Sequence, residues 1–309
     1  MPVPEEALTN RGPAPQPLPA SSRSHARAVL AVLGAASLWG ISGVVARSLF
    51  NRAVDPAHLV QFRMLVGGAA LLPVALWRGG ARVPPRLWPL MAGYAVMLTI
   101  VQFTYFKAVQ LAGVAVAIFL QYTAPLLVAA WEAARSRSWP ARPVSLALAA
   151  ATAGSGLLVL PGGPLHVPAA GFAFGLASAF GMAGGTVAAG ALRRRGMGAT
   201  PLIAHGLLIG SLAFWPVRAP WVALATVPDW PYFVYIAVFA TAVPFALYVS
   251  ALRLLSGSVT ILLAMLEPVL AAGLAWVALG EGLSAVQLAG GALILGGVAL
   301  AAVGARQGG

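Results

Sequence analysis

The sequence contains no cysteine and very little charge. Only 8% of its 309 residues are Asp, Glu, Lys or Arg, while 60% are apolar and the mean hydropathy is +0.87. The lack of cysteine excludes a disulfide framework, a thiolate nucleophile and a thiolate metal site. Soluble domains carry about 25% charged residues, because a folded surface needs charge to stay hydrated. This chain is therefore not an ordinary soluble domain.

The apolar residues are gathered into ten long blocks separated by short connections. A bilayer core about 30 Å thick needs roughly 20 consecutive helical residues, since an α-helix rises about 1.5 Å per residue. We predict an all-α polytopic membrane protein with ten transmembrane helices, whose function takes place between those helices. The predicted helices span 28–46, 59–77, 88–106, 114–131, 144–160, 169–192, 200–217, 230–252, 257–279 and 285–303.

The basic residues fall mainly on one side of these helices. With the N-terminus in the cytoplasm, 14 of the 19 basic residues lie on the cytoplasmic side, including the run Arg193-Arg194-Arg195. The positive-inside rule therefore predicts that both termini are cytoplasmic, which an even number of helices allows. The same rule accounts for the net charge of +12 without a nucleic-acid partner. Residues 1–27 are expected to be a disordered cytoplasmic tail because they are rich in proline, and 305–309 a C-terminal tail.

Two parts of the chain resemble each other at a nearly constant offset. Four small residues of the first block recur 141 positions later, and a longer match has an offset of 143. We predict two five-helix repeats, 28–160 and 161–304. Since each has an odd number of helices, the second enters the membrane from the opposite side, as in many secondary transporters. A duplicated but static membrane protein is the alternative. The most informative matched pairs are Tyr105 with Tyr248 and Pro125 with Pro268.

Several short motifs follow one another along the chain. They are Ser37-Leu38-Trp39-Gly40, Arg63, Tyr122-Thr123-Ala124-Pro125 and Glu267-Pro268, followed by Gly280-Glu281. In this order they resemble the EamA family of the drug/metabolite transporter superfamily. The resemblance covers about 28–304. It implies a secondary transporter of small organic solutes in a ten-helix fold, with bacterial relatives that export amino acids and other metabolites. The first repeat departs from the pattern, because it has Glu132 where a Gly-Glu pair is expected after the fourth helix.

Polar side chains within the blocks outline a candidate pathway, because an unpaired polar group in hydrocarbon is costly and usually faces the bundle interior. Glu267 is the one acidic residue well inside a block, and Ser256, Thr260 and Glu267 are spaced to share one helical stripe. Glu267 could couple transport to protons or hold a substrate ammonium; a purely structural role stays open. The predicted substrate-binding residues are Trp39, Gln102, Tyr105, Gln121, Tyr122, Tyr248, Thr260 and Glu267.

Arg63 and two prolines complete the candidate site. Arg63 lies four residues inside the second block, so its guanidinium could snorkel to the outer surface. Alternatively, it forms an outer-mouth charge for a substrate carboxylate. Pro125 and Pro268 each remove an amide donor and disturb the carbonyl four residues earlier. Because they occupy equivalent repeat positions, we predict paired hinges, with accidents of packing as the alternative.

Motifs of soluble enzyme chemistry are missing. The sequence has no H-E-x-x-H, no P-loop, no G-x-S-x-G and no His–carboxylate cluster with metal spacing, so we expect no enzyme, cofactor or metal. We predict an exporter of small metabolites such as amino acids, working by alternating access in a bacterial-type inner membrane and driven by protons. A multidrug or other solute permease or exchanger is one alternative, and a non-transporting membrane scaffold is another. The expected partners are a small solute, lipids and protons.

Overall fold

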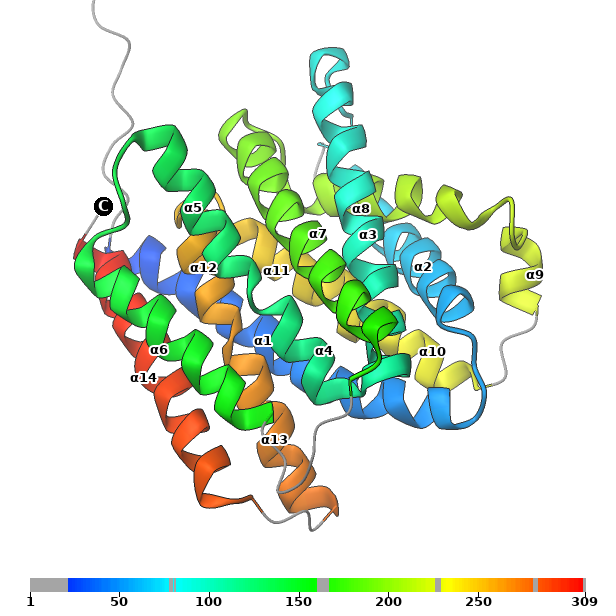
Figure 1. The fold of residues 1–309 in the computed structure, drawn as a ribbon. Coiled ribbons are helices and arrows are strands. Elements are labelled where there is room, and N and C mark those ends of the chain that lie inside the picture. Colours follow the sequence, from blue (N-terminus) through cyan, green and yellow to red (C-terminus); the bar gives the residue numbers. More distant parts are fainter. Residues whose placement is uncertain are drawn as a thin grey trace, which may run out of the picture.

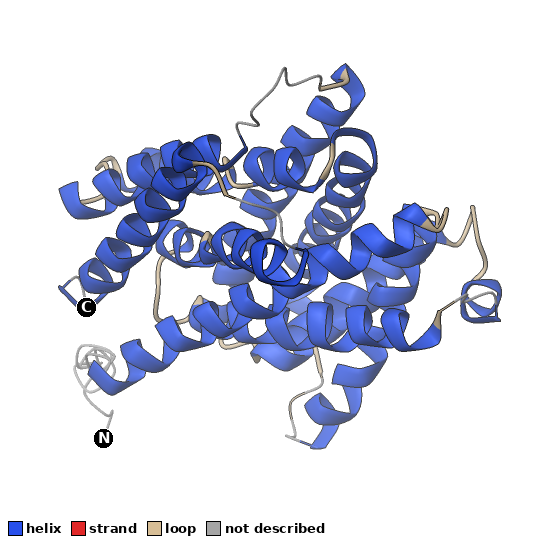
Figure 2. Ribbon diagram, turned by 90° about the horizontal axis from the view of Figure 1, so that it is seen from below, coloured by secondary structure: helices blue, strands red, loops and turns tan. Residues whose placement is uncertain are grey.

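The computed structural model describes residues 22–77, 80, 82–159, 167–225, 229–279 and 283–307. These ranges are almost entirely helical and contain no strand (Figures 1 and 2). The helices of the first predicted repeat are α1 (Ser22–Asn51), α2 (Pro56–Trp77), the short 3₁₀ turn η2 (Pro85–Leu87), α3 (Trp88–Ala112), α4 (Val114–Gln121), α5 (Ala124–Ser136) and α6 (Arg142–Val159).

The second predicted repeat follows the same order, with one extra short helix. Its helices are α7 (Ala169–Arg194), α8 (Ala199–Ser211), the 3₁₀ turn η3 (Leu212–Phe214), α9 (Pro220–Ala225), α10 (Trp230–Ala237), the π-helical turn η4 (Val238–Ala242), α11 (Val243–Ala251), α12 (Gly257–Ala264), α13 (Leu266–Leu279) and α14 (Ala285–Gln307).

Nine helical segments of the described ranges are long and apolar enough to cross a bilayer, which confirms the all-α membrane fold. The predicted span 200–217 corresponds to a shorter apolar helix, Ala199–Phe214. α1 begins at Ser22, inside the predicted tail, because no proline follows Pro19 to prevent an early helix start. Residues 1–21 of that tail, and Gly280-Glu281, lie outside the described residues. At the other end, α14 continues to Gln307, past the predicted boundary at 304.

The strongest helix contacts join the two repeats. α3 packs along α7, α6 along α14, α2 along α8, and α1 against both α11 and α13. If the two repeats were exchanged, α11 would take the place of α3 and α1 the place of α7. The α3–α7 pair would then become the α11–α1 pair, whereas the α2–α8 and α6–α14 pairs would each stay the same pair. This pattern is expected of two copies related by a pseudo-two-fold axis. Figure 1 shows α6 and α14 side by side along one edge of the molecule.

Two glycines allow α6 and α14 to approach closely. A Cβ atom on Gly154 would lie 2.5 Å from the carbonyl oxygen of Gly290, and a Cβ on Gly290 would lie 2.6 Å from the carbonyl oxygen of Gly154. Any side chain at either position would force the backbones apart. Small residues are the usual means of close helix packing in membranes, where burial of apolar surface between helices gains little.

Three spans are interrupted just before a proline. α4 gives way to α5 at Tyr122 and Thr123, before Pro125, and α12 gives way to α13 at Met265, before Pro268. α10 joins α11 through the π-helical turn η4, before Pro244. Each proline lacks the N–H that would bond the carbonyl four residues earlier. The breaks therefore fall where the sequence predicts paired hinges, and the π-helical turn adds a third.

One ion pair joins the two repeats outside the spans. Arg52 Nη1, after α1, donates to Asp229 Oδ2, before α10, at 2.8 Å, and the guanidinium lies 5.6 Å from the centre of the Tyr232 ring. The hydrogen bond and the charge of Asp229 raise the pKa of the Arg52 guanidinium. The pair is exposed, so its contribution to stability is small.

Candidate functional site

Most of the predicted site residues line one cavity between the helices. Six of the eight predicted substrate-binding residues are there, together with Arg63. The cavity holds about 40 Å³, enough for only one or two water molecules. Its walls come from α1, α2, α3, α7, α11, α13 and the end of α4, so both repeats contribute. The lining residues are Trp39, Ser42, Arg63, Val101, Gln102, Tyr105, Phe106, Gln121, Tyr122, Met182, Phe245 and Glu267.

Arg63 is held inside the bundle by η4 of the other repeat. Its Nε donates to Thr241 Oγ1 at 2.6 Å and its Nη2 donates to the Ala240 carbonyl at 2.9 Å, while the guanidinium lies 4.7 Å from the centre of the Phe106 ring. Only 4% of the residue is exposed. The snorkelling interpretation is therefore wrong, because these contacts direct the side chain inward. Pro244 cannot donate to the Ala240 carbonyl, and Arg63 supplies a donor in its place.

Glu267 faces Tyr122 from the opposite repeat. Tyr122 Oη lies 2.7 Å from Glu267 Oε2 and 2.9 Å from the carbonyl oxygen of Ala264. That carbonyl is the one to which Pro268 cannot donate. A Cβ on Gly40 would lie 3.2 Å from the Glu267 carbonyl oxygen, so the glycine of the Trp39-Gly40 motif lets α1 pack against the turn that carries the carboxyl group.

The cavity combines a guanidinium, a carboxyl group and an amide donor. Arg63 and Glu267 both line it, but the only salt bridge found in the described part of the chain is the distant pair Arg52–Asp229. The amide nitrogen of Gln102, Nε2, is buried in the cavity wall and has no hydrogen-bond partner. A buried polar atom without a partner is costly, so the site is suited to a ligand that supplies an acceptor.

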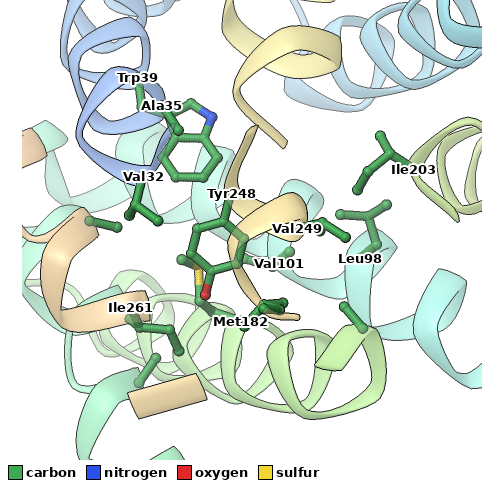
Figure 3. Close-up of a cluster of buried hydrophobic side chains, with 14 of the residues drawn as sticks. Val32, Ala35, Trp39, Leu98, Val101, Met182, Ile203, Tyr248, Val249 and Ile261 are labelled. Carbon is green, nitrogen blue, oxygen red and sulfur yellow. The ribbon is translucent and has the colours of Figure 1, made fainter. Parts of the chain in front are cut away.

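Tyr248 lies next to this cavity rather than in its wall. Its hydroxyl shares a 2.7 Å hydrogen bond with Thr186, and its ring centre lies 5.7 Å from that of Trp39. Figure 3 shows the Tyr248 side chain between Trp39 of α1 and Met182 of α7. Tyr248 and Thr186 line a second small cavity, which shares Val101, Met182 and Phe245 with the first.

The structure does not bring Thr260 to the site. Its Oγ1 donates to the Ser256 carbonyl, one turn earlier, and the residue is fully buried in α12. α12 ends at Ala264 and α13 begins at Leu266, so the spacing of seven to Glu267 does not run along one continuous helix. The predicted stripe of Ser256, Thr260 and Glu267 is interrupted for this reason.

A third, larger cleft of about 470 Å³ lies at the arginine-rich ends of α5 and α7. It shares Thr186 with the second cavity, so the three cavities follow one another from Glu267 toward the side predicted to be cytoplasmic. Thr186, whose hydroxyl shares a hydrogen bond with Tyr248, lines both the second cavity and this cleft. The residues that line the large cleft are Trp131, Glu132, Arg135, Ser136, Thr186, Val187, Gly190, Arg194, Leu252, Ser256 and Gly257.

The comparisons with known proteins agree with this duplicated architecture. The sequence pattern of the EamA-like transporter family matches the chain twice, over residues 26–160 and 169–303. The chain belongs to the EamA-like transporter family. The two matches correspond to the two predicted five-helix repeats, and the resemblance identified from the short motifs is confirmed. This EamA-like protein is an integral membrane transporter.

Uncharacterized transporters of Salmonella typhimurium, Bacillus subtilis and Archaeoglobus fulgidus are similar to this EamA-like transporter. The uncharacterized inner membrane transporter YicL of Salmonella typhimurium is 28% identical over 294 residues, covering 92% of this chain and 98% of the relative. The uncharacterized transporter YwfM of Bacillus subtilis is 28% identical over 284 residues, covering 90% and 94%. A crystal structure with a TM-score of 0.72 and 23% identity covers 90% of this chain and 98% of its own, which shows a shared fold.

Several residues of this EamA-like transporter were not singled out from the sequence. Glu132 was noted only as a departure from the family motif. In the structure its Oε1 accepts from the Gly257 backbone N–H at 2.8 Å and its Oε2 from the Ser258 hydroxyl at 2.6 Å. Glu132 thus caps the first turn of α12 from α5 of the other repeat. Phe245 of α11 lines the cavity and was missed, because a phenylalanine in an apolar block gives no signal of its own. Thr241, which shares a polar stripe with Pro244 and Tyr248 in the sequence, does not line the cavity but accepts a hydrogen bond from Arg63 Nε.

Proposed function

We propose that this transporter exports small zwitterionic metabolites, such as amino acids, by alternating access around the central cavity, with Glu267 as the proton-coupling group. The observation that carries the proposal is the placement of Arg63 and Glu267 around one buried cavity without a salt bridge between them. A cation and a carboxyl group held apart in this way complement a solute that carries both charges.

Recognition follows from the groups that remain available. The Arg63 guanidinium donates through Nε and Nη2 to η4, and within the described part of the chain its Nη1 makes no hydrogen bond. A substrate carboxylate at that edge would form charge-assisted hydrogen bonds, and Gln102 Nε2 offers a further donor. Glu267 would take the ammonium group. The rings of Trp39 and Tyr105 would pack against the apolar part of the solute.

Alternating access is supported by how closed the centre is. A cavity of about 40 Å³ is too small for an amino acid, so the site must widen to take a solute. The breaks before Pro125 and Pro268 are the proposed hinges. On the side facing the large cleft, the Glu132 cap holds the two repeats together, and the Thr186–Tyr248 bond joins α7 to α11 within the second repeat. We propose that these contacts separate when the site opens inward.

The location in an inner membrane, the outward direction of transport and the two cytoplasmic termini are also part of the proposal. The Salmonella relative is named as an inner membrane transporter, which supports the location. The arginine-rich cleft supports the orientation, because basic residues favour the cytoplasmic side.

Flux measurements in proteoliposomes test this function. We expect one or more amino acids from a labelled panel to exchange across the membrane, and a pH gradient to drive their accumulation. Glu267→Gln should abolish accumulation driven by the gradient, because the amide cannot carry a proton, whereas Asp229→Asn, which removes a carboxyl outside the cavity, should not. Gradient dependence that survives in Glu267→Gln would refute the coupling role.

The same panel separates the alternatives. Flux restricted to bulky organic cations would favour a multidrug permease. Exchange that no pH gradient accelerates would indicate a facilitative exchanger. Absence of flux for every solute, with the protein correctly folded, would favour a scaffold.

A further inference from the structure

We propose that the described conformation holds Glu267 in its protonated form, and that Tyr122 is a positioning residue whose hydrogen bond passes from the Ala264 carbonyl to Glu267 when the proton leaves. The proposal rests on the proposed function of Glu267 and adds the element that would respond to its proton. It concerns the contact between the α4–α5 junction and the α12–α13 junction.

The Tyr122 hydroxyl has more acceptors within reach than it has hydrogens. Tyr122 has one hydroxyl hydrogen, yet its oxygen lies 2.9 Å from the Ala264 carbonyl and 2.7 Å from Glu267 Oε2. A carbonyl and a carboxylate are both acceptors only. If Glu267 were ionised, the single hydrogen could satisfy just one of them. If Glu267 is protonated, it donates to the Tyr122 oxygen, and Tyr122 donates to Ala264, so every group has a partner.

The Ala264 carbonyl needs that donor. Pro268, four residues later, has no N–H to offer, and the residue stands at the end of α12, fully buried. In a membrane interior water is scarce, so a carbonyl without a donor is costly. The Tyr122 hydroxyl therefore compensates for the proline as long as Glu267 does not compete for its hydrogen.

Release of the proton changes this arrangement. When the proton leaves Glu267 for a water molecule or a solute in the cavity, the carboxylate becomes an acceptor with a full negative charge. A hydrogen bond to a charged acceptor is the stronger one, so the Tyr122 O–H turns from Ala264 to Glu267. The Ala264 carbonyl then lacks a donor, and the junction between α12 and α13 must rearrange to find one.

A neighbouring contact shows why the Tyr122 bond is conditional. Arg63 donates in the same way to the Ala240 carbonyl, to which Pro244 cannot donate. Arginine has donors to spare and stays charged, so that bond does not depend on protonation. Tyr122 has one hydrogen for two acceptors. The repeat offset of 143 also places Met265 at the position equivalent to Tyr122, so the second repeat has no hydroxyl at the matching place.

The groups around Glu267 come from several elements. Among the described residues, the titratable side chains that line the cavity with it are Tyr122, Arg63 of α2 and Tyr105 of α3, and Tyr248 of α11 lines the adjoining cavity. α1 contributes Trp39, Gly40 and Ser42, α7 contributes Met182, and none of these titrates. Arg63 donates to η4, and Tyr122 is the group in direct hydrogen-bond contact with the Glu267 carboxyl.

The switch can be measured as a distance. The natural sequence has no cysteine, so spin labels can be placed at Leu127→Cys on α5 and Leu274→Cys on α13, both exposed positions beyond the junctions. We expect the distance distribution from double electron–electron resonance to change with pH. The ratio of the two arrangements should change by about tenfold or more, the usual effect of one hydrogen bond to a charged group.

Three variants in this labelled background give the decision. Tyr122→Phe should abolish the pH-dependent change. Tyr94→Phe should preserve it, because that buried hydroxyl has no hydrogen-bond partner to lose. Glu267→Gln, whose amide donates to Tyr122 as a protonated carboxyl does, should keep the acidic distance at every pH.

A pH response that persists in Tyr122→Phe, or an alkaline distance in Glu267→Gln, would overturn the switch. A distance that does not change with pH in the labelled protein without further substitution would also overturn the switch. If Tyr122→Phe does not fold, the distance measured in Glu267→Gln still tests the switch. Gradient-driven flux without any pH-dependent distance would overturn the switch alone, whereas a pH-dependent distance without solute flux would support the switch and refute the proposed function.

Discussion

Two side chains of the first repeat complete the hydrogen bonding of carbonyls in the second. Arg63 donates to Ala240 and Tyr122 donates to Ala264, and in both cases a proline has removed the usual helical donor. Each of these side chains also lines the central cavity. The residues proposed to recognise the solute are thus the same ones that hold the interrupted helices together, so solute binding and helix geometry are linked at single hydrogen bonds.

The role of Arg63 in recognition gives a prediction about specificity. In Arg63→Lys the ammonium is a compact charge that cannot bond Ala240, Thr241 and a carboxylate at once. We expect amino-acid affinity to fall about 10- to 100-fold, the usual effect of losing hydrogen bonds between charged groups. Affinity for the matching decarboxylated amine should change little. Competition binding with each acid–amine pair measures the difference.

Thr241→Val is the control for that experiment. It removes one partner of Arg63 but keeps the guanidinium, so we expect a smaller loss of amino-acid affinity than in Arg63→Lys. If Arg63→Lys weakened the acid and the amine equally, the carboxylate would not bind at Arg63, and the residue would serve only to support η4.

Residue types in the apolar blocks predicted most of the cavity, but not the contacts within it. Glu267, Gln102 and Tyr122 stand out because polar groups are rare in such blocks, and they do line one cavity. The burial of Arg63 could not be predicted, since its partners lie 177 and 178 residues away on a π-helical turn. The position of Arg63 near the end of its predicted helix indicated an outward side chain, whereas the contacts with the π-helical turn direct it inward.

At the scale of helices, the close approach of α6 and α14 predicts that a methyl group placed between them destabilises the protein. Gly290→Ala places a methyl group 2.6 Å from the Gly154 carbonyl oxygen, so the helices must separate. We expect a loss of about 1–3 kcal/mol in the free energy of unfolding, the typical effect of overpacking. A thermal or denaturant unfolding measurement in detergent would detect it.

The adjacent glycine provides the matched comparison. Gly291 has no atom within 4 Å of an ideal Cβ, so Gly291→Ala should leave stability unchanged or raise it slightly. Equal destabilisation by both substitutions would mean that glycine flexibility, rather than close contact, matters in α14.

Helix positions followed from apolar block length, and helix interruptions followed from prolines. The breaks at Tyr122 and Met265 fall where Pro125 and Pro268 predict them. The π-helical form of η4 was beyond prediction, because Pro244 alone does not distinguish a break from a π-turn. The shortness of α8 was also missed: the apolar block 200–217 continues past its end into η3, so composition does not mark the end of the helix.

At the scale of the whole molecule, the two repeats are tied together unequally at their two ends. Near the large cleft, the Glu132 carboxylate of the first repeat accepts hydrogen bonds from the Gly257 backbone N–H and the Ser258 hydroxyl of the second. Away from it, the exposed pair Arg52–Asp229 links the loops before α2 and α10. The cleft end has partly buried contacts, which water screens less than an exposed ion pair. If the cleft faces the cytoplasm, as its arginines predict, a transporter closed in this way would expose its site first to the outer side.

The proposed mechanism requires the repeats to be inverted, and this determines the side on which each connection lies. The lack of native cysteine makes the test simple, since each single-cysteine variant has only one site to label. In intact cells, an impermeant maleimide should label Asn51→Cys and Val217→Cys, and should reach Ser138→Cys and Arg195→Cys only after permeabilisation. Asn51 and Val217 follow the first and the seventh predicted span, so an even number of crossings separates them. They must therefore share one face of the membrane, and the arginine-rich connections must share the other.

If Asn51→Cys and Val217→Cys were labelled from opposite sides, the second repeat would not be an inverted copy of the first. The two halves could then not exchange roles around the Arg63–Glu267 cavity, and alternating access would lose its structural basis.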